Sequence, residues 1–196
     1  MNHLDTYFNQ VELIAQVLRE PKNIDILIKI VNSLVDVRNR WGRVFVVGVG
    51  GSAGNASHMV NDLRKLCGIE AYAPTDNVSE LTAWANDTSM DVFFSQWLRG
   101  SNLCPRDLVF VLSVGGGTET VSKCIVNAVD LAIERGALVL GIVGKSNGYV
   151  AKHGDIVMVV PEVHPALLTP LSESFQAVIW HALVSDPRLQ KRPTTW

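Results

Sequence analysis

Residues 44–63 read VFVVGVGGSAGNASHMVNDL, and this stretch decides the fold. A run of apolar, mostly β-branched residues at 44–47 leads directly into a glycine-rich turn at 48–54, and a helix-like segment follows at 53–66. Such a run is typical of a strand that is buried on both faces of a parallel sheet. A strand that passes through a tight turn into a helix is the first half of a β-α-β unit.

The same pattern recurs along the chain. Further apolar runs lie at 108–112, 138–143 and 156–160, with a weaker candidate strand at 69–72. Helix-like segments lie at 118–134 and 147–153, and Thr169 with Pro170 predicts the start of a last helix that ends near Ser185. Alternation of strands and helices predicts an α/β fold with a doubly wound parallel sheet.

Residues 1–40 contain two amphipathic helical patterns separated by Pro21. Two helices alone bury too little surface to form a domain, so we treat 1–196 as a single domain with a helical N-terminal extension. The extension must pack on the sheet or on other subunits. Its apolar faces exceed what one small sheet can cover, which predicts a homotetramer.

The composition excludes several classes of protein. The net charge is -2, no run of eighteen apolar residues is present, and the N-terminus does not resemble a signal peptide. We therefore expect a cytoplasmic protein with no nucleic-acid or membrane partner. Cys67, Cys104 and Cys124 are odd in number and lack CxxC spacing, so we read them as small buried residues and expect no disulfide framework or thiolate metal site.

Two glycine-rich turns follow strands. The first is GVGGSAG at 48–54, and the second is SVGGGTET at 113–120. Glycine lets the backbone approach a ligand closely, and the free N–H groups of a following helix favour an anion. One such turn can be plain turn chemistry, but two at the carboxyl ends of strands of one sheet predict a phosphate site. Neither is a Walker A or dinucleotide sequence, which argues against a nucleotide. Hydroxyl donors are available from Ser52, Ser113, Thr118 and Thr120.

His58 and Asp62 lie four residues apart on the helix after the first turn, and so project from one face. An imidazole and a carboxylate at this spacing can share a metal ion or a proton. The same pair is also common as a solvated ion pair on a helix surface. The spacing alone leaves both interpretations open.

Five segments together resemble the phosphoheptose isomerase branch of the SIS family, from Trp41 to the last helix. They are GVGGSAGNASHMVNDL, NDTSMDVFFSQWL, LVFVLSVGGGTETV, GIVGKSNGYVAKHGDIVMVVP and FQAVIWH. The resemblance implies a five-stranded parallel sheet of flavodoxin-like type, a phosphate-binding loop and a homotetramer. It also implies isomerisation of sedoheptulose 7-phosphate to D-glycero-D-manno-heptose 7-phosphate through an enediol, which supplies heptose for lipopolysaccharide or another glycan.

The resemblance also implies roles for individual residues. Zinc, or another divalent ion, is expected on His58, Asp62, Glu173 and His181, with Asp62 and His181 as the acid/base pair. Contacts to the sugar phosphate are expected from Gly51, Ser52, Asn86, Asp87, Ser113, Gly115, Gly116, Gly117, Thr118 and Glu173.

This chain departs from the family at two of these positions, with Asp62 in place of a glutamate and Glu173 in place of a glutamine. Two histidines and two carboxylates suit a divalent ion. Glu173 and His181 are eight residues apart, or about 12 Å along a straight helix, so sharing one ion would need a bend, a later start of the helix or two subunits.

Other functions remain open at this point. A non-catalytic SIS protein, either a sugar-phosphate sensor or an adaptor like the tetrameric regulator that binds the replication initiator DnaA, would keep the phosphate loops and lose the acid/base pair. An isomerase of another ketose phosphate, such as a hexulose phosphate, would use the same loops. The presence of His58, Asp62 and His181 favours an enzyme.

Overall fold

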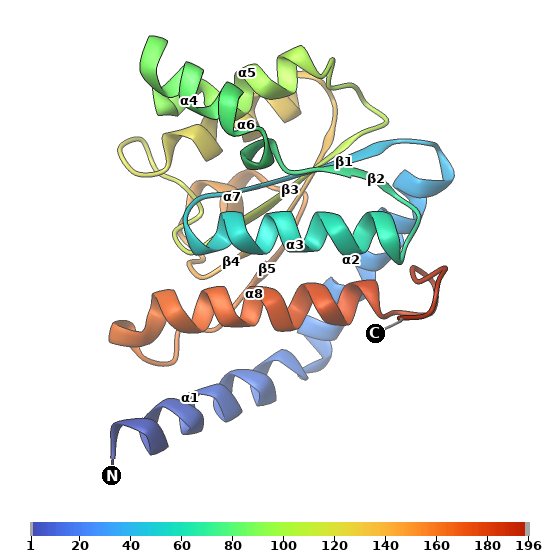
Figure 1. Ribbon diagram of the computed structural model, residues 1–196. Coiled ribbons are helices and arrows are strands. Elements are labelled where there is room, and N and C mark those ends of the chain that lie inside the picture. Colours follow the sequence, from blue (N-terminus) through green and yellow to red (C-terminus); the bar gives the residue numbers. More distant parts are fainter. Residues whose placement is uncertain (1, 195–196) are drawn as a thin grey trace.

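Five parallel strands form one sheet, in the order β2-β1-β3-β4-β5, in the computed structural model, which describes residues 2–194 (Figure 1). The strands are β1 (Arg43–Gly48), β2 (Glu70–Tyr72), β3 (Leu108–Ser113), β4 (Leu138–Val143) and β5 (Ile156–Val159). The predicted five-stranded, doubly wound parallel sheet is confirmed. This order is that of flavodoxin-like folds, and it changes direction between β1 and β3.

Helices cover both faces of the sheet (Figure 1). One face carries α2 (Pro21–Asn39), α3 (Gly51–Lys65) and α8 (Leu168–Val184), with α1 (His3–Leu18) beside them. The other face carries α5 (Phe93–Gly100), α6 (Lys123–Glu134) and α7 (Tyr149–His153), with α4 (Val78–Asp87) packed against α5. Three short 3₁₀ turns complete the chain: η1 (Pro74–Asp76), η2 (Met90–Val92) and η3 (Pro165–Leu167).

Alternation of side chains along the strands divides the core between the two faces. In β1, Val44 and Val46 point to the face of α2, α3 and α8, whereas Phe45 and Val47 point to the face of α5 and α6. All four side chains are fully buried. This explains the continuous apolar runs in the sequence, because a strand covered on both faces has no solvent-facing position.

Helix boundaries differ from the predictions at two places. The segment predicted as helix from 118 begins only at Lys123, because Ser122 has a φ of 53° and interrupts the helix. The last helix begins at Leu168, directly after η3, so Pro170 is its third residue and Thr169 is no N-cap. Proline is tolerated there, because N–H groups of the first turn have no partner within the helix.

The N-terminal helices divide between core and surface. α2 buries Ile30, Leu34 and Val37 against the sheet. α1 buries Ile14 and Leu18 near its end, while Leu4 and Phe8 are exposed. Figure 1 shows α1 at the outside of the fold, where it contacts α2. Within residues 2–194, no helix combines the length and apolarity that crossing a bilayer requires.

The cysteines are all free, and two of them are buried as predicted. Burial raises the pKa of Cys67 to about 11, and its thiol contacts the carbonyl oxygen of Val184. Burial also raises the pKa of Cys124. Cys104 is only half-buried, which differs from the prediction for all three.

A buried ion pair joins the amino ends of β1 and β3. Asp107 is 1% exposed and accepts hydrogen bonds from the Arg43 side chain at 2.7 Å and from the Arg43 and Cys104 amides at 3.0 Å. Burial opposes ionisation of Asp107, but these hydrogen bonds outweigh it, and the net result is a lowered pKa.

The lowered pKa of Asp107 predicts that the fold loses stability in acid. Because the folded pKa of Asp107 lies below its unfolded value, its charge stabilises the fold above about pH 4, and that contribution is lost as pH falls further through the folded pKa. We expect the free energy of unfolding to fall less steeply between pH 5 and pH 3 in Asp107→Asn than in the unaltered chain, as measured by urea titration. Equal slopes would contradict this assignment.

Candidate active site

The two glycine-rich turns meet where the strand order changes direction. β1 ends at Gly48 and β3 ends at Ser113, and Gly48 is paired with Leu112 in the sheet. In open α/β sheets, ligands bind in the crevice outside the carboxyl ends of the strands at this point. The turns therefore lie where the sequence predicted a phosphate site.

The second turn is held in a defined shape by its own hydrogen bonds. The buried Ser113 Oγ accepts a bond from the Gly116 amide at 3.0 Å. The carbonyls of Gly116 and Gly117 accept bonds from Val150 and Tyr149 at the start of α7, both at 2.9 Å. An added Cβ at Gly115 would meet no atom within 4 Å, so this residue borders open space. Ser113 can still donate its hydroxyl hydrogen to a ligand.

Thr118 closes the second turn. Its Oγ1 accepts bonds from the Thr120 and Val121 amides, at 3.3 and 2.9 Å, and its own amide donates to the Val121 carbonyl. This hydroxyl-capped turn replaces the first turn of the predicted helix. The Thr118 side chain is exposed and retains a hydroxyl hydrogen to donate.

The first turn brings together α3 and α8. Ser52 is 1% exposed, and its hydroxyl has no hydrogen-bond partner within the described part of the chain. An added Cβ on Gly51 would lie 2.6 Å from Cδ and 2.8 Å from Oε1 of Glu173, so the carboxylate of Glu173 packs directly on Gly51. Asn55 Nδ2 fixes this contact by donating to the Glu173 carbonyl at 2.9 Å and to Gln176 Oε1 at 3.2 Å.

Further along the same two helices, His58, Asp62 and His181 come together. One ligand atom from each lies within 4.8 Å of the others. The two imidazole rings are 5.2 Å apart between centroids and nearly perpendicular, and the His181 ring stacks on the buried Trp180. The histidines are exposed, whereas Asp62 is 9% exposed. The prediction that His58 and Asp62 share a site with His181 therefore has a geometric basis.

Hydrogen bonds orient two of these groups. His181 Nδ1 lies 2.8 Å from the carbonyl oxygen of Ala177, which can only accept, so Nδ1 carries the proton and Nε2 is left for another partner. Asn61 Nδ2 donates to Asp62 Oδ1 at 2.8 Å. In metal sites, a ligating histidine usually donates its other ring N–H to a carbonyl or a carboxylate, and a ligating carboxylate usually accepts a further hydrogen bond. His181 and Asp62 each have such a partner.

The cluster fits a divalent metal ion as a set of three ligands. Two imidazoles and one carboxylate match catalytic zinc sites, which keep a position open for water or substrate. They border a cavity of about 400 Å³ that Lys65 and Thr194 also line. Sequence reasoning missed Asn61 and Lys65, although helical spacing from His58 and Asp62 places both near the same face of α3.

Glu173 does not join the cluster in this chain. α3 and α8 lie side by side and run in the same direction (Figure 1), so Glu173 pairs with Gly51 while His181 pairs with His58. Seven residues along α3 and eight along α8 separate these two levels by about 10–12 Å. A role for Glu173 as a ligand to the same ion stays a prediction that would need a second subunit.

Asn86 and Asp87 lie in the last turn of α4, which belongs neither to the Gly51–Glu173 contact nor to the histidine cluster. Asn86 donates to Asp87 at 2.8 Å, and both side chains are exposed. α4 packs mainly against η1, η2 and α5. Their contact with sugar hydroxyls stays a prediction.

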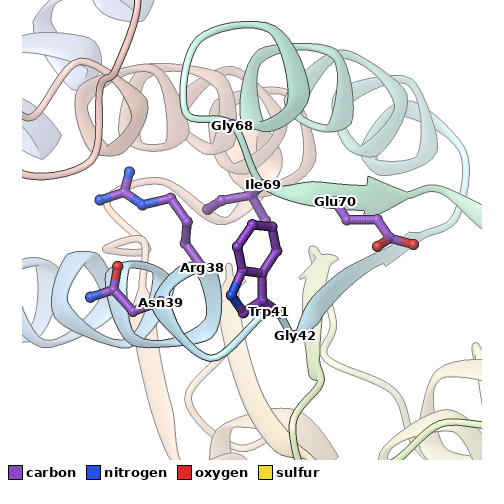
Figure 2. Close-up of a pocket in the computed structure, with 7 residues that line it drawn as sticks. All are labelled: Arg38, Asn39, Trp41, Gly42, Gly68, Ile69 and Glu70. Carbon is purple, nitrogen blue, oxygen red and sulfur yellow. The ribbon is translucent and has the colours of Figure 1, made fainter.

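A separate hollow lies at the opposite edge of the sheet, near the starts of β1 and β2. Figure 2 shows the Trp41 ring standing among Arg38, Ile69 and Glu70 around a cavity of about 400 Å³. Trp41 is 87% exposed. The Arg38 guanidinium donates to the carbonyls of Cys67, Arg188 and Leu189, so its hydrogen bonds serve the fold. None of the predicted site residues lines this hollow.

Comparisons with known proteins identify the family and the fold. Residues 6–144 match the family described as SIS domain. Phosphoheptose isomerase of Chlorobaculum tepidum is 30% identical over 74% of this chain and 70% of that protein. The lincomycin biosynthesis protein LmbN of Streptomyces lincolnensis is 32% identical over 76% of this chain, which spans only 57% of LmbN. The structure of phosphoheptose isomerase GmhA from Neisseria gonorrhoeae superposes with a TM-score of 0.81 at 23% identity, over 92% of this chain and 95% of that one.

Proposed function

Since the chain belongs to the SIS domain family, we propose that it is an aldose–ketose isomerase of sugar phosphates, converting sedoheptulose 7-phosphate to D-glycero-D-manno-heptose 7-phosphate. The relatives named phosphoheptose isomerase support this choice of substrate. The product would feed synthesis of heptose-containing glycans.

One observation carries the proposal: His58, Asp62 and His181 converge on the same two helices whose first turns border the glycine loops. Phosphate bound at the crevice would place the rest of an extended sugar along α3, toward the cluster. The two levels lie about 10–12 Å apart, which favours a long sugar phosphate over a short one. A site of this form supplies an anchor at one end and proton-transfer groups at the other.

In the proposed mechanism, the glycine loops bind the phosphate and fix the orientation of the carbon chain. One member of the Asp62 and His181 pair removes a proton from C1 of the ketose while the other protonates the oxygen at C2, giving an enediol. Removal of the O1 proton and reprotonation at C2 then yield the aldose. Asn61 holds one oxygen of Asp62, and Ala177 holds the protonated nitrogen of His181, which leaves one atom of each available either to exchange a proton or to bind a metal ion. Zinc or another divalent ion on His58, Asp62 and His181 would polarise the substrate oxygens.

A direct test offers the purified chain five- to seven-carbon ketose phosphates, with and without a chelator. We expect turnover to be fastest with sedoheptulose 7-phosphate and to fall when metal is removed. Faster turnover of a hexulose phosphate would mean that the proposed reaction is right and the proposed substrate is wrong. Binding of heptose phosphate without turnover, in the presence of added metal, would instead favour a sensor or an adaptor.

We also propose that the protein is a cytoplasmic homotetramer. The exposed apolar side chains of the N-terminal helices support this, because a partner subunit can cover them. The main members are Leu4, Phe8, Leu13, Ile24 and Ile28. Light scattering at micromolar concentration is expected to give four times the mass of one chain. We expect Phe8→Glu to dissociate the tetramer, and a monomeric mass for the unaltered chain would contradict the proposal.

A further inference from the structure

After α8 the chain returns across the end of α3. Residues 186–190 form a compact turn, in which the Leu189 and Gln190 amides donate to the Asp186 carbonyl at 2.9 and 2.8 Å. Leu189 is fully buried and belongs to the same core cluster as the buried residues of α3 and α8. We call residues 186–194 the C-terminal strap. The burial of Leu189 fixes this strap to the body of the protein.

Two further contacts hold the strap. The Arg38 guanidinium on α2 donates to the Leu189 carbonyl. The amides of Lys191 and Arg192 both donate to the Leu66 carbonyl, at 2.8 and 3.1 Å. Leu66 directly follows α3, and the last carbonyls of a helix have no partner within the helix. The strap therefore completes the hydrogen bonding at the end of α3.

The strap brings Thr194 to the cavity that the three candidate metal ligands border. Arg192 is bonded to Leu66, and two residues of chain span at most about 7 Å, so Thr194 lies near the Leu66 end of α3. Leu66 is about 12 Å beyond His58 along α3, on the side away from Gly51. Along this helix, the candidate ligands therefore lie between the first glycine turn and the strap.

This order matches the two ends of a ketose phosphate. Under the proposed function, on which this step rests, the phosphate binds at the glycine turns, and C1 and C2 react at Asp62 and His181. C1 is the terminal carbon of the sugar, so a group attached to O1 would extend past the candidate ligands toward Thr194. Among the described residues, all others that line the cavity belong to α3, to α8 or to the residues directly after them. The strap supplies the wall that these two helices leave out.

We propose that the C-terminal strap is the end wall of the substrate site, and that Thr194 determines how large the C1 end of the substrate can be. A ketose with a free O1 hydroxyl fits, whereas a group attached to O1 meets the Thr194 side chain. A wall excludes a ligand only if it keeps its position. The buried Leu189 side chain and the bonds from Arg38 and to Leu66 keep the strap in position.

The test measures affinity by calorimetry for two ligands, sedoheptulose 7-phosphate and its 1-O-methyl ether. We expect the unaltered chain to bind the ether at least about tenfold more weakly, because one added carbon in a fitted pocket changes discrimination by roughly 10–200-fold. Thr194→Ala removes a methyl and a hydroxyl group and should remove most of this difference. Thr194→Trp should narrow the cavity and weaken binding of both ligands.

The matched control is Thr82→Trp, which adds the same large side chain on α4, no described residue of which lines this cavity. It should leave both affinities unchanged. Thr194 is exposed, so its substitutions should leave the fold intact, and thermal unfolding checks this.

Three results would overturn the proposal: equal affinity of the unaltered chain for the two ligands, the same ratio of affinities in Thr194→Ala as in the unaltered chain, or unweakened binding by Thr194→Trp. All three come from binding alone. A chain that isomerises heptose phosphate but shows any of them would keep its proposed function and lose this inference. A chain that binds heptose phosphate without turnover can still show the expected affinities, and would then lose only the proposed function.

Discussion

Asp62→Asn and His181→Ala are each expected to lower turnover of sedoheptulose 7-phosphate by about 100-fold or more. Positioned acid and base groups contribute roughly 10²–10⁴ in rate, and each substitution removes the group that exchanges the proton. Steady-state kinetics measure the loss. Sugar-phosphate affinity should change far less, because the proposed phosphate site lies some 10 Å away along α3. Asp91→Asn and His3→Ala alter exposed residues of the same types outside the site and serve as controls.

The same two variants should also lose a bound divalent ion. Each removes one of three ligands, and metal affinity depends on the full set. Metal content after dialysis separates this effect from proton transfer. Wild-type turnover in both variants, on a substrate that the native chain demonstrably isomerises, would rule out chemistry at this pair.

Gly115→Val is expected to abolish sugar-phosphate binding and leave the fold intact. An added Cβ at Gly115 meets no atom within 4 Å, so the valine side chain would fill only the space that the ligand needs. Gly116→Val differs, since Gly116 has a φ of 72° and lies close to Gly148, and a β-branched residue there is strained. It should lose binding and also unfold at lower temperature.

Calorimetry with sugar phosphate and thermal unfolding together distinguish the two variants. Gly100→Val at the end of α5 adds the same side chain in open space away from the site and is the matched control. Undiminished affinity in folded Gly115→Val would remove the second glycine turn from the binding site.

The sheet could be predicted from the sequence because its strands are buried on both faces. β1, β3 and β4 are nearly continuous apolar runs, and glycine turns follow two of them. α4 was not predicted in this way. Val78, Leu81 and Trp84 recur at helical spacing, but the helix is only ten residues long and buries none of them fully, with Leu81 and Trp84 half-buried against the core.

The candidate site was predictable only in part. The spacing of His58 and Asp62 indicated a shared face, but their approach to His181 depends on how α8 is placed lengthwise against α3. That placement also decides that Glu173 reaches Gly51 instead of the histidines. Side-chain packing between the helices sets it, through contacts such as Asn55 with Gln176, and spacing within one helix carries no information about it.

The parallel course of α3 and α8 limits how this protein can change in evolution. Each residue turns a helix by about 100°, so a single insertion between Gly51 and His58 would rotate the histidine away from α8 while leaving the glycine turn in place. A deletion between Glu173 and His181 would have the same effect from the other side. Substitutions can accumulate on the outer surfaces of both helices, but the number of residues from Gly51 to His58 and from Glu173 to His181 is fixed.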